Sequence, residues 1–207
     1  MIRELHYLKA MGYHFIDENL KDENLKNDFS VKNFKDLQNS VKNCTLCHFS
    51  KTRRHVLMEK EQKSVRLLIL ASFAQKSENE SGILLDSLRG ENLKKILQEI
   101  LGLKRENFYF SYLFKCFSYS KFDNFSLQSC LPFFWNELKL VKPKIVLCLG
   151  EYAFEGLGFK NFNALRGEIF AYEDFFIMPS FELEFIEKNP SYKKDFIDDL
   201  KKLKGFL

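Results

Sequence analysis

Apolar residues along the chain gather in short continuous runs that alternate with stretches of helical spacing. Continuous apolar runs predict strands covered on both faces of a sheet, and four of them occur at residues 66–72, 107–113, 144–150 and 175–180. Apolar positions three and four residues apart predict helices, at 2–12, 34–41, 90–101, 123–141, 151–157 and 190–203. Strands that alternate with helices predict an α/β fold in which a parallel sheet carries helices on both faces.

Individual residues mark where these helices begin and end. Gly102 is expected to close the helix before it, and Asp123 is expected to cap the start of the next long helix. Asn189 and Pro190 form a typical start for the last helix. Pro132 is expected to kink its helix or to limit the first turns.

The chain of 207 residues, of which 45% are hydrophobic, is long enough for one domain with a substantial core. We assign that domain to residues 35–207 and expect an N-terminal helix and a polar linker at residues 1–34. The polar residues 74–82 predict a loop. The net charge of +4 permits a polyanionic partner without requiring one.

The sequence also carries expectations about location and assembly. It has no continuous apolar run of about 18 residues, so no membrane span is expected, and its first residues lack the apolar core of a signal peptide. Free cysteines without an export signal indicate a reducing, cytoplasmic location. We expect a monomer.

Parallel strands place their carboxyl ends at one edge of the sheet, where α/β folds bind their ligands. The residues that follow the predicted strands should therefore line a crevice at that edge, and they are Ser72, Phe73, Tyr112, Ser180 and Phe181. Cys116 should lie at the border of this crevice.

Four of the five cysteines form a pattern typical of a metal centre. Cys44 and Cys47 form a C-x2-C pair that presents two thiolates from one turn, and Cys116 and Cys130 complete four soft ligands. Four thiolates suit either zinc or a [4Fe–4S] cluster. The wide spacing between Cys116 and Cys130 favours the cluster, because structural zinc usually takes its ligands from two closely spaced pairs. Cys148 lies within a predicted strand, where it should act as a small hydrophobe.

Two further segments carry residues that suit nucleic acid. The basic segment 51–55 includes Arg53 and Arg54, and it either contacts phosphate or forms a solvated turn. The loop at 117–125 interleaves aromatic residues with Lys121, and its rings either stack on bases or pin the loop against the core. The abundance of Phe, at 23 residues, favours the second interpretation of this loop.

Several short segments occur in an order and at spacings that match one known family. They are Cys44-x2-Cys47, Lys51-Thr-Arg53, Lys115-Cys116, Cys130-x-Pro132-Phe133, Lys142-Pro143, Leu149-Gly150 and Leu165-Arg166-Gly167. In these segments the chain resembles the family 4 uracil-DNA glycosylases, which are [4Fe–4S] enzymes of the uracil-DNA glycosylase superfamily. The resemblance implies a three-layer α/β/α sandwich around a four-stranded parallel sheet. It also implies that Cys44, Cys47, Cys116 and Cys130 hold the cluster and that DNA is a partner, with candidate contacts at Arg53, Arg54, Lys115 and Arg166.

The positions that perform catalysis in this family are different here. Family members carry a Gly-Glu-Ala-Pro-Gly loop after the first strand, an aromatic residue that stacks on the flipped base, an Asn after the second strand and a His-Pro pair after the last. The corresponding positions are Ala71–Gln75, Leu85, Tyr112 and Glu182–Leu183. Excision of uracil needs hydrogen-bond donors that stabilise negative charge on the departing base. An ionised Glu182 would repel that charge.

We therefore predict a DNA-binding, DNA-repair-related iron–sulfur protein that has lost the usual residues for uracil excision. A first alternative is a divergent but active DNA glycosylase for uracil or another damaged base, with Glu182, Glu184, Asp86 or Lys121 as the reacting group. A second alternative is a non-catalytic module that binds a protein partner and is held together by the cluster.

Overall fold

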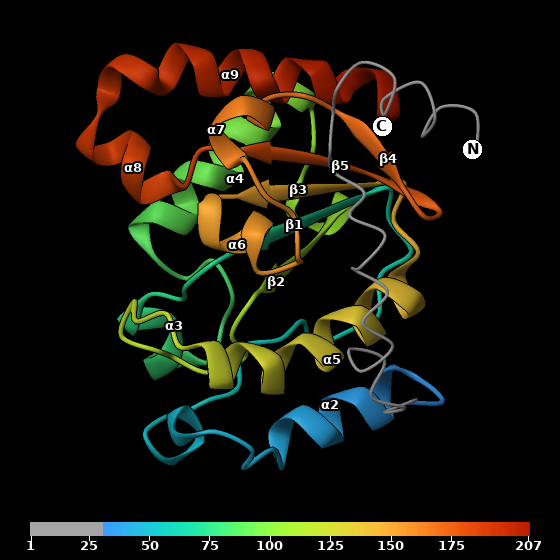
Figure 1. Ribbon diagram of the computed structural model, residues 1–207, viewed down its shortest axis with the longest axis vertical. Coiled ribbons are helices and arrows are strands. Elements are labelled where there is room, and N and C mark those ends of the chain that lie inside the picture. The colour runs from blue at the N-terminus through green and yellow to red at the C-terminus, as the bar shows by residue number, and fades with distance from the viewer. Residues whose placement is uncertain (1–30) are drawn as a thin grey trace.

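The computed structural model describes residues 31–207, so the predicted N-terminal helix at 2–12 and nearly all of the predicted linker lie outside the described residues. Within the described part, five strands form one sheet in the order β2-β1-β3-β5-β4 (Figure 1). The strands are β1 Leu67–Ala71, β2 Phe108–Tyr112, β3 Ile145–Leu149, β4 Phe170–Tyr172 and β5 Phe175–Ser180.

Four of these strands correspond to the predicted ones and pair in parallel, which confirms the α/β fold. The predicted number of four strands is wrong, because β4 adds an antiparallel edge strand next to β5. This strand has three half-buried residues and reaches β5 through a two-residue turn, in which Glu173 has a φ of 47°. A strand so short carries no apolar run of the ~4–8 residues by which sequence patterns reveal strands.

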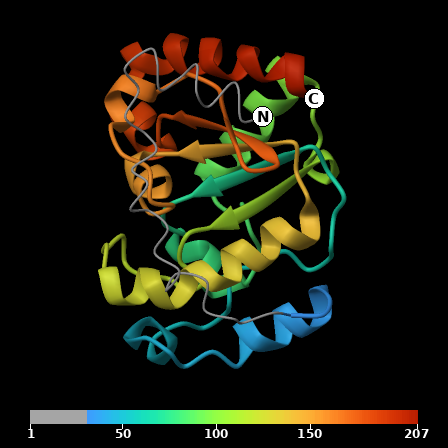
Figure 2. The same cartoon turned by 45° about the vertical axis from the view of Figure 1, so that its right-hand side comes forward.

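Helices cover both faces of the sheet, so the structure has the expected three layers (Figure 2). Alternate strand residues serve the two cores: Leu68 and Leu70 pack with α2, α5, α6 and α7, whereas Leu67 and Ile69 pack with α4, α8 and α9. The helices are α2 Phe34–Lys42, α3 Lys76–Ser81, α4 Leu88–Leu101, α5 Asn124–Val141, α6 Glu151–Glu155, α7 Phe162–Leu165, α8 Leu183–Lys188 and α9 Lys193–Lys202. Short 3-10 turns are η3 His48–Lys51, η4 Arg105–Asn107, η5 Pro190–Tyr192 and η6 Leu203–Phe206. No helix among residues 31–207 combines the length and the apolar character needed to cross a bilayer.

Most of the predicted helix ends are confirmed. Gly102 ends α4 with a φ of 70°, and the Asp123 carboxylate accepts a hydrogen bond of 2.8 Å from the backbone N–H of Ser126. The helix α5 continues through Pro132 to Val141, so this proline does not confine the helix to its first turns.

Two local predictions are wrong. The polar segment at 74–82 is not a loop, because α3 forms there and the Glu78 carboxylate caps its start by accepting from the N–H of Gln75 at 2.7 Å. Asn189 does not cap the last helix, since its side-chain amide donates to the carbonyl oxygen of Phe185 at 2.9 Å. The 3-10 turn η5 separates Asn189 from α9.

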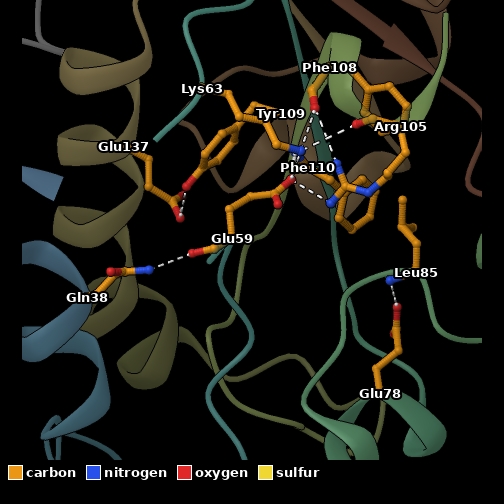
Figure 3. Close-up of polar contacts among 10 residues, drawn as sticks. All are labelled: Gln38, Glu59, Lys63, Glu78, Leu85, Arg105, Phe108, Tyr109, Phe110 and Glu137. Atoms are coloured by element: carbon orange, nitrogen blue, oxygen red, sulfur yellow. Dashed lines mark hydrogen bonds and ion pairs between the residues drawn. The ribbon is translucent and has the colours of Figure 1, made fainter. Parts of the chain in front are cut away.

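A buried carboxylate covers the outer edge of β2, which is an edge strand of the sheet (Figure 3). Glu59 accepts hydrogen bonds from the N–H of Phe110 at 3.1 Å and from the guanidinium of Arg105 at 2.6 Å, and it pairs with Lys63 at 3.3 Å. The side chain of Gln38 donates to the Glu59 carbonyl at 2.9 Å, which ties α2 to the same segment. The stretch of chain around Glu59 therefore covers the outer edge of β2, which would otherwise be open to another strand.

Replacing Glu59 with Ala should destabilise the protein by about 2–4 kcal/mol, because the N–H of Phe110 and two cations would lose their acceptor. The measurement is the free energy of unfolding by chemical denaturation followed by circular dichroism. Glu168→Ala is the matched control, since its pair with Lys202 is exposed and 3.5 Å long, and it should cost less than about 1 kcal/mol. Equal effects of the two substitutions would contradict this role of Glu59.

Candidate functional site

The four cysteines predicted as ligands come together at one end of the molecule. Cys44 and Cys47 follow α2, Cys116 follows β2, and Cys130 lies in α5. The thiol of Cys130 donates a hydrogen bond to the sulfur of Cys47, and Cys116 interacts electrostatically with both Cys44 and Cys47. Segments far apart in the sequence therefore place their sulfur atoms in one neighbourhood.

The surroundings of these thiols favour the thiolate form of Cys47. The bond from Cys130 lowers the pKa of Cys47 to about 5, while the same bond and burial raise the pKa of Cys130. Burial raises the pKa of Cys116, opposed by the guanidinium of Arg53, which donates to its sulfur at 3.2 Å. Cys148 is fully buried in β3, and burial alone raises its pKa.

The thiols do not enclose a point where one ion would bind. Among residues 31–207, no group of three or more His, Cys, Asp or Glu side chains is placed to hold a metal ion. A [4Fe–4S] cluster makes a different demand on its protein, because each of its four cysteines binds a separate iron at a corner of the cluster.

A buried ion pair fixes two of the segments that carry these thiols. The Lys115 ammonium donates to the Glu137 carboxylate and to the Ser111 hydroxyl, both at 2.6 Å, and to the carbonyl of Tyr112 at 3.0 Å. The Tyr109 hydroxyl donates to the other oxygen of Glu137 at 3.0 Å (Figure 3). The pair links the residue before Cys116 to the helix that carries Cys130.

This burial corrects the expectation that Lys115 contacts DNA. The residue is 1% exposed, and the three donors of its ammonium all have acceptors inside the protein. A cation held in this way is not available to a phosphate at the surface.

A small hollow lies at the edge where the parallel strands end, with space of about 30 Å³. Pockets for drug-sized ligands have volumes of roughly 300–1,000 Å³, so this space suits one or two water molecules rather than a base. Of the residues expected to line a crevice there, Phe73 and Tyr112 do so, together with Glu182. The complete lining is Ala71, Phe73, Gln75, Leu85, Ser87, Arg89, Gly90, Phe110, Tyr112, Leu149, Glu182 and Leu183.

One buried carboxylate keeps this edge closed. Glu78 accepts from the Tyr112 hydroxyl at 2.6 Å. It also accepts from the N–H of Leu85 at 2.6 Å (Figure 3). Leu85 is 1% exposed and has a φ of 61°, in the left-handed region. A side chain on Gly90 would meet the backbone of Leu85 at 2.5 Å, so only glycine admits Leu85 to this position. One wall of the hollow is thus formed by a leucine whose backbone is held in place.

Glu182 is the acidic residue on the wall of the hollow. Burial raises its pKa above the ordinary value, and the neighbouring Glu184 adds to the effect. The nearby cation Arg89 is engaged elsewhere, since it pairs with Glu184 at 3.2 Å and with Glu187 at 2.9 Å. A Cβ atom on Gly150 would lie 3.4 Å from Ser72 Oγ and 3.5 Å from the carboxyl carbon of Glu182, so both groups flank this glycine.

The other predicted residues lie apart from the hollow. Ser180 donates to Asp199 at 2.7 Å, and Arg166 pairs with the same carboxylate at 2.7 Å. The ring of Phe181 lies under the Arg166 guanidinium, with 4.4 Å between the ring centroid and the guanidinium carbon. Lys121 is exposed on its loop. The buried hydroxyl of Ser72 has no hydrogen-bond partner among the described residues.

Sequence reasoning missed the two charged residues that organise this edge. The spacing Gln75-x-x-Glu78 is a capping signal that indicates the start of a helix, and it could have revealed α3. Nothing local in the sequence reveals that Glu78 turns inward to Tyr112. Arg89 directly precedes the predicted helix at 90–101. Nothing near it in the sequence indicates its acidic partners, Glu184 and Glu187, which lie far along the chain.

Comparison with known proteins agrees with this fold. Residues 58–202 match the uracil DNA glycosylase superfamily, and the chain belongs to that superfamily. It is 21% identical over 183 residues to the type-4 uracil-DNA glycosylase of Saccharolobus solfataricus, covering 83% of this chain and 85% of the relative. It is also 21% identical over 180 residues to the type-4 uracil-DNA glycosylase of Sulfurisphaera tokodaii, covering 81% and 82%. The resemblance drawn from the sequence segments is confirmed.

The two glutamates beside the hollow should respond to pH in opposite ways. The pKa of Glu182 is raised in the folded protein above its ordinary value of 4.5, so the ionised carboxylate disfavours the folded state. Glu182→Gln should therefore stabilise the protein at neutral pH but not at pH below 4.5, where the carboxyl group is protonated in both states. The pairs with Lys188 and Arg89 lower the pKa of Glu184, so Glu184→Gln should destabilise at neutral pH, and its effect should shrink as the pH falls. Thermal unfolding midpoints across this pH range measure both effects. Destabilisation by Glu182→Gln at neutral pH would show that its carboxylate has a stabilising partner.

Proposed function

We propose that this protein is an iron–sulfur member of the uracil DNA glycosylase superfamily that binds DNA in a repair-related role without excising uracil. The observation that carries the proposal is the small size of the hollow beyond the parallel strands, where Leu85 and Tyr112 line a space of about 30 Å³. The relatives are named for uracil excision, so the proposal concerns what this chain has lost as well as what it keeps.

Excision requires a pocket that accepts a flipped base and donors that stabilise negative charge on the departing base. The space of about 30 Å³ is too small for a base. The Tyr112 hydroxyl donates to Glu78, so it is not free to donate to a base. Glu182 offers a carboxylate where a donor is needed. Size and charge therefore both oppose uracil excision.

The donor set supports a cluster held by Cys44, Cys47, Cys116 and Cys130. Four thiols from three distant segments meet, three of them are buried, and Arg53 donates to one sulfur as a compensating cation. Thiolates are the ligands of iron–sulfur clusters, and such a cluster would join α2, the end of β2 and α5 through metal–sulfur bonds. Zinc is the alternative occupant of the same thiols. Free cysteines of this kind suit a reducing compartment such as the cytoplasm.

A second candidate function is an active glycosylase for a different lesion. It is favoured by one observation: Glu182 has a raised pKa and flanks Gly150 together with the unpartnered hydroxyl of Ser72. Carboxyl groups with a raised pKa commonly serve as general acids or bases in enzymes. The lesion would have to open the hollow by displacing Leu85.

The anaerobically purified protein should bind DNA and release no uracil from single-stranded or mismatched uracil substrates. Binding is measured by fluorescence anisotropy, and excision is measured by strand cleavage at the resulting abasic sites. The Saccharolobus solfataricus relative is the positive control in the same buffer. Catalytic release of uracil would contradict the proposal. Turnover of another damaged base that is lost in Glu182→Gln would establish the second candidate.

Cys44→Ala should remove the brown colour and most of the iron and sulfide, and it should lower the thermal midpoint, because distant segments would lose a shared tie. Cys148→Ala is the matched control, since this thiol is fully buried in β3 and no other cysteine contributes to its pKa shift, and it should retain full iron content. Equal iron content in the two variants would contradict the ligand assignment.

A further inference from the structure

A second and larger hollow lies beside the thiol centre and has no role in the proposal above. It has a volume of about 320 Å³, and its lining residues come from the end of α2, the turn after η3 and the end of α3. Four of its lining residues are basic. The complete lining is Lys42, Arg53, Arg54, His55, Val56 and Gly82.

Among the described residues, the basic side chains around this hollow have no carboxylate partner, although Arg53 contacts the sulfur of Cys116. Within residues 31–207, none of its four basic side chains pairs with a carboxylate, and no acidic residue lines it. Elsewhere in the same structure Arg89, Arg105 and Arg166 each pair with a carboxylate at 3.2 Å or less. Cations that converge on one cavity without a carboxylate partner in the described part of the chain, here Lys42 and Arg54, create a local positive potential that concentrates anions.

The walls of the hollow are held in place before any ligand arrives. Arg53 donates to the Lys42 carbonyl at 2.7 Å and to the Cys116 sulfur at 3.2 Å. The N–H of Arg54 donates to the Asn79 side chain at 3.0 Å. A Cβ on Gly82, whose φ is +70°, would lie 2.9 Å from the ring of His55, so glycine lets this ring settle against the end of α3.

We propose that this hollow binds a phosphate group of a nucleic-acid backbone. Arginine and lysine donors form strong charge-assisted hydrogen bonds with phosphate oxygens, and a space of about 320 Å³ admits a phosphodiester together with part of its sugars. Lys42 and Arg54 are the exposed donors, whereas Arg53 is partly occupied by its contacts to the backbone and to Cys116. The identity of the polymer rests on the DNA binding proposed above, but the anion site itself does not.

The test compares Lys42→Gln, Arg54→Gln and their double variant with the double control Lys201→Gln/Lys204→Gln, whose residues are exposed on α9 and η6 at the opposite end of the molecule (Figure 1). Arg53 is left intact because it contacts a cysteine of the thiol centre. The readout is the slope of log affinity for an oligonucleotide against log salt concentration, since each lost phosphate contact should reduce that slope by about 1.

We expect a smaller slope and several-fold weaker DNA binding in the hollow variants, and a smaller effect in the control. If the wild-type protein binds DNA and the hollow variants match the control, the phosphate site is overturned while DNA binding stands.

If the wild-type protein does not bind DNA, the proposed function fails, and a titration with inorganic pyrophosphate decides the site separately. If pyrophosphate binds saturably and the double variant loses this binding, the hollow is a phosphate site whose ligand is a free phosphate compound. No binding, or equal binding by the double variant, would overturn it.

Discussion

The ion pair between Lys115 and Glu137 fixes the relation between the sheet and the region of the thiols. Its two side chains are 2% and 1% exposed, and their charged atoms are 2.6 Å apart. Burying two charges has a cost of several kcal/mol per ion unless hydrogen bonds replace the lost water. Here Ser111, Tyr109 and the Tyr112 carbonyl supply those bonds. The pair thereby sets how β2, with Cys116 just beyond it, meets α5 and Cys130.

Two other buried carboxylates complete the frame around β2. Glu59 covers the outer edge of this strand, and Glu78 binds the hydroxyl of Tyr112 at its last residue. The three acids act in different places but share one property, since each accepts at least two hydrogen bonds inside the protein. The result is a well-fixed strand end that leaves no space for a base. The fold of the superfamily is thus retained, and the residues at this edge of the sheet surround a hollow of about 30 Å³.

Local patterns predicted the four parallel strands and most helix ends, because buried apolar runs and capping residues are visible within a few residues. The C-x2-C pair pointed to the cysteines that the fold brings into one neighbourhood, while their role as ligands stays a prediction. The short strand β4 and the inward turn of Glu78 could not be predicted in this way, since both depend on partners brought together only by folding. The resemblance to the family predicts that Lys115 contacts DNA, whereas the structure buries this residue. Its partner Glu137 lies on a separate helix, and nothing near Lys115 in the sequence indicates it.

The central claim is that the four thiols hold an iron–sulfur cluster within a fold whose base pocket is closed. X-ray absorption spectroscopy of the anaerobically purified protein tests the cluster most directly. The account predicts an iron edge with a first shell of sulfur and a second shell of neighbouring iron atoms, as in a [4Fe–4S] centre. Zinc as the only bound metal, with four sulfur neighbours, would contradict it.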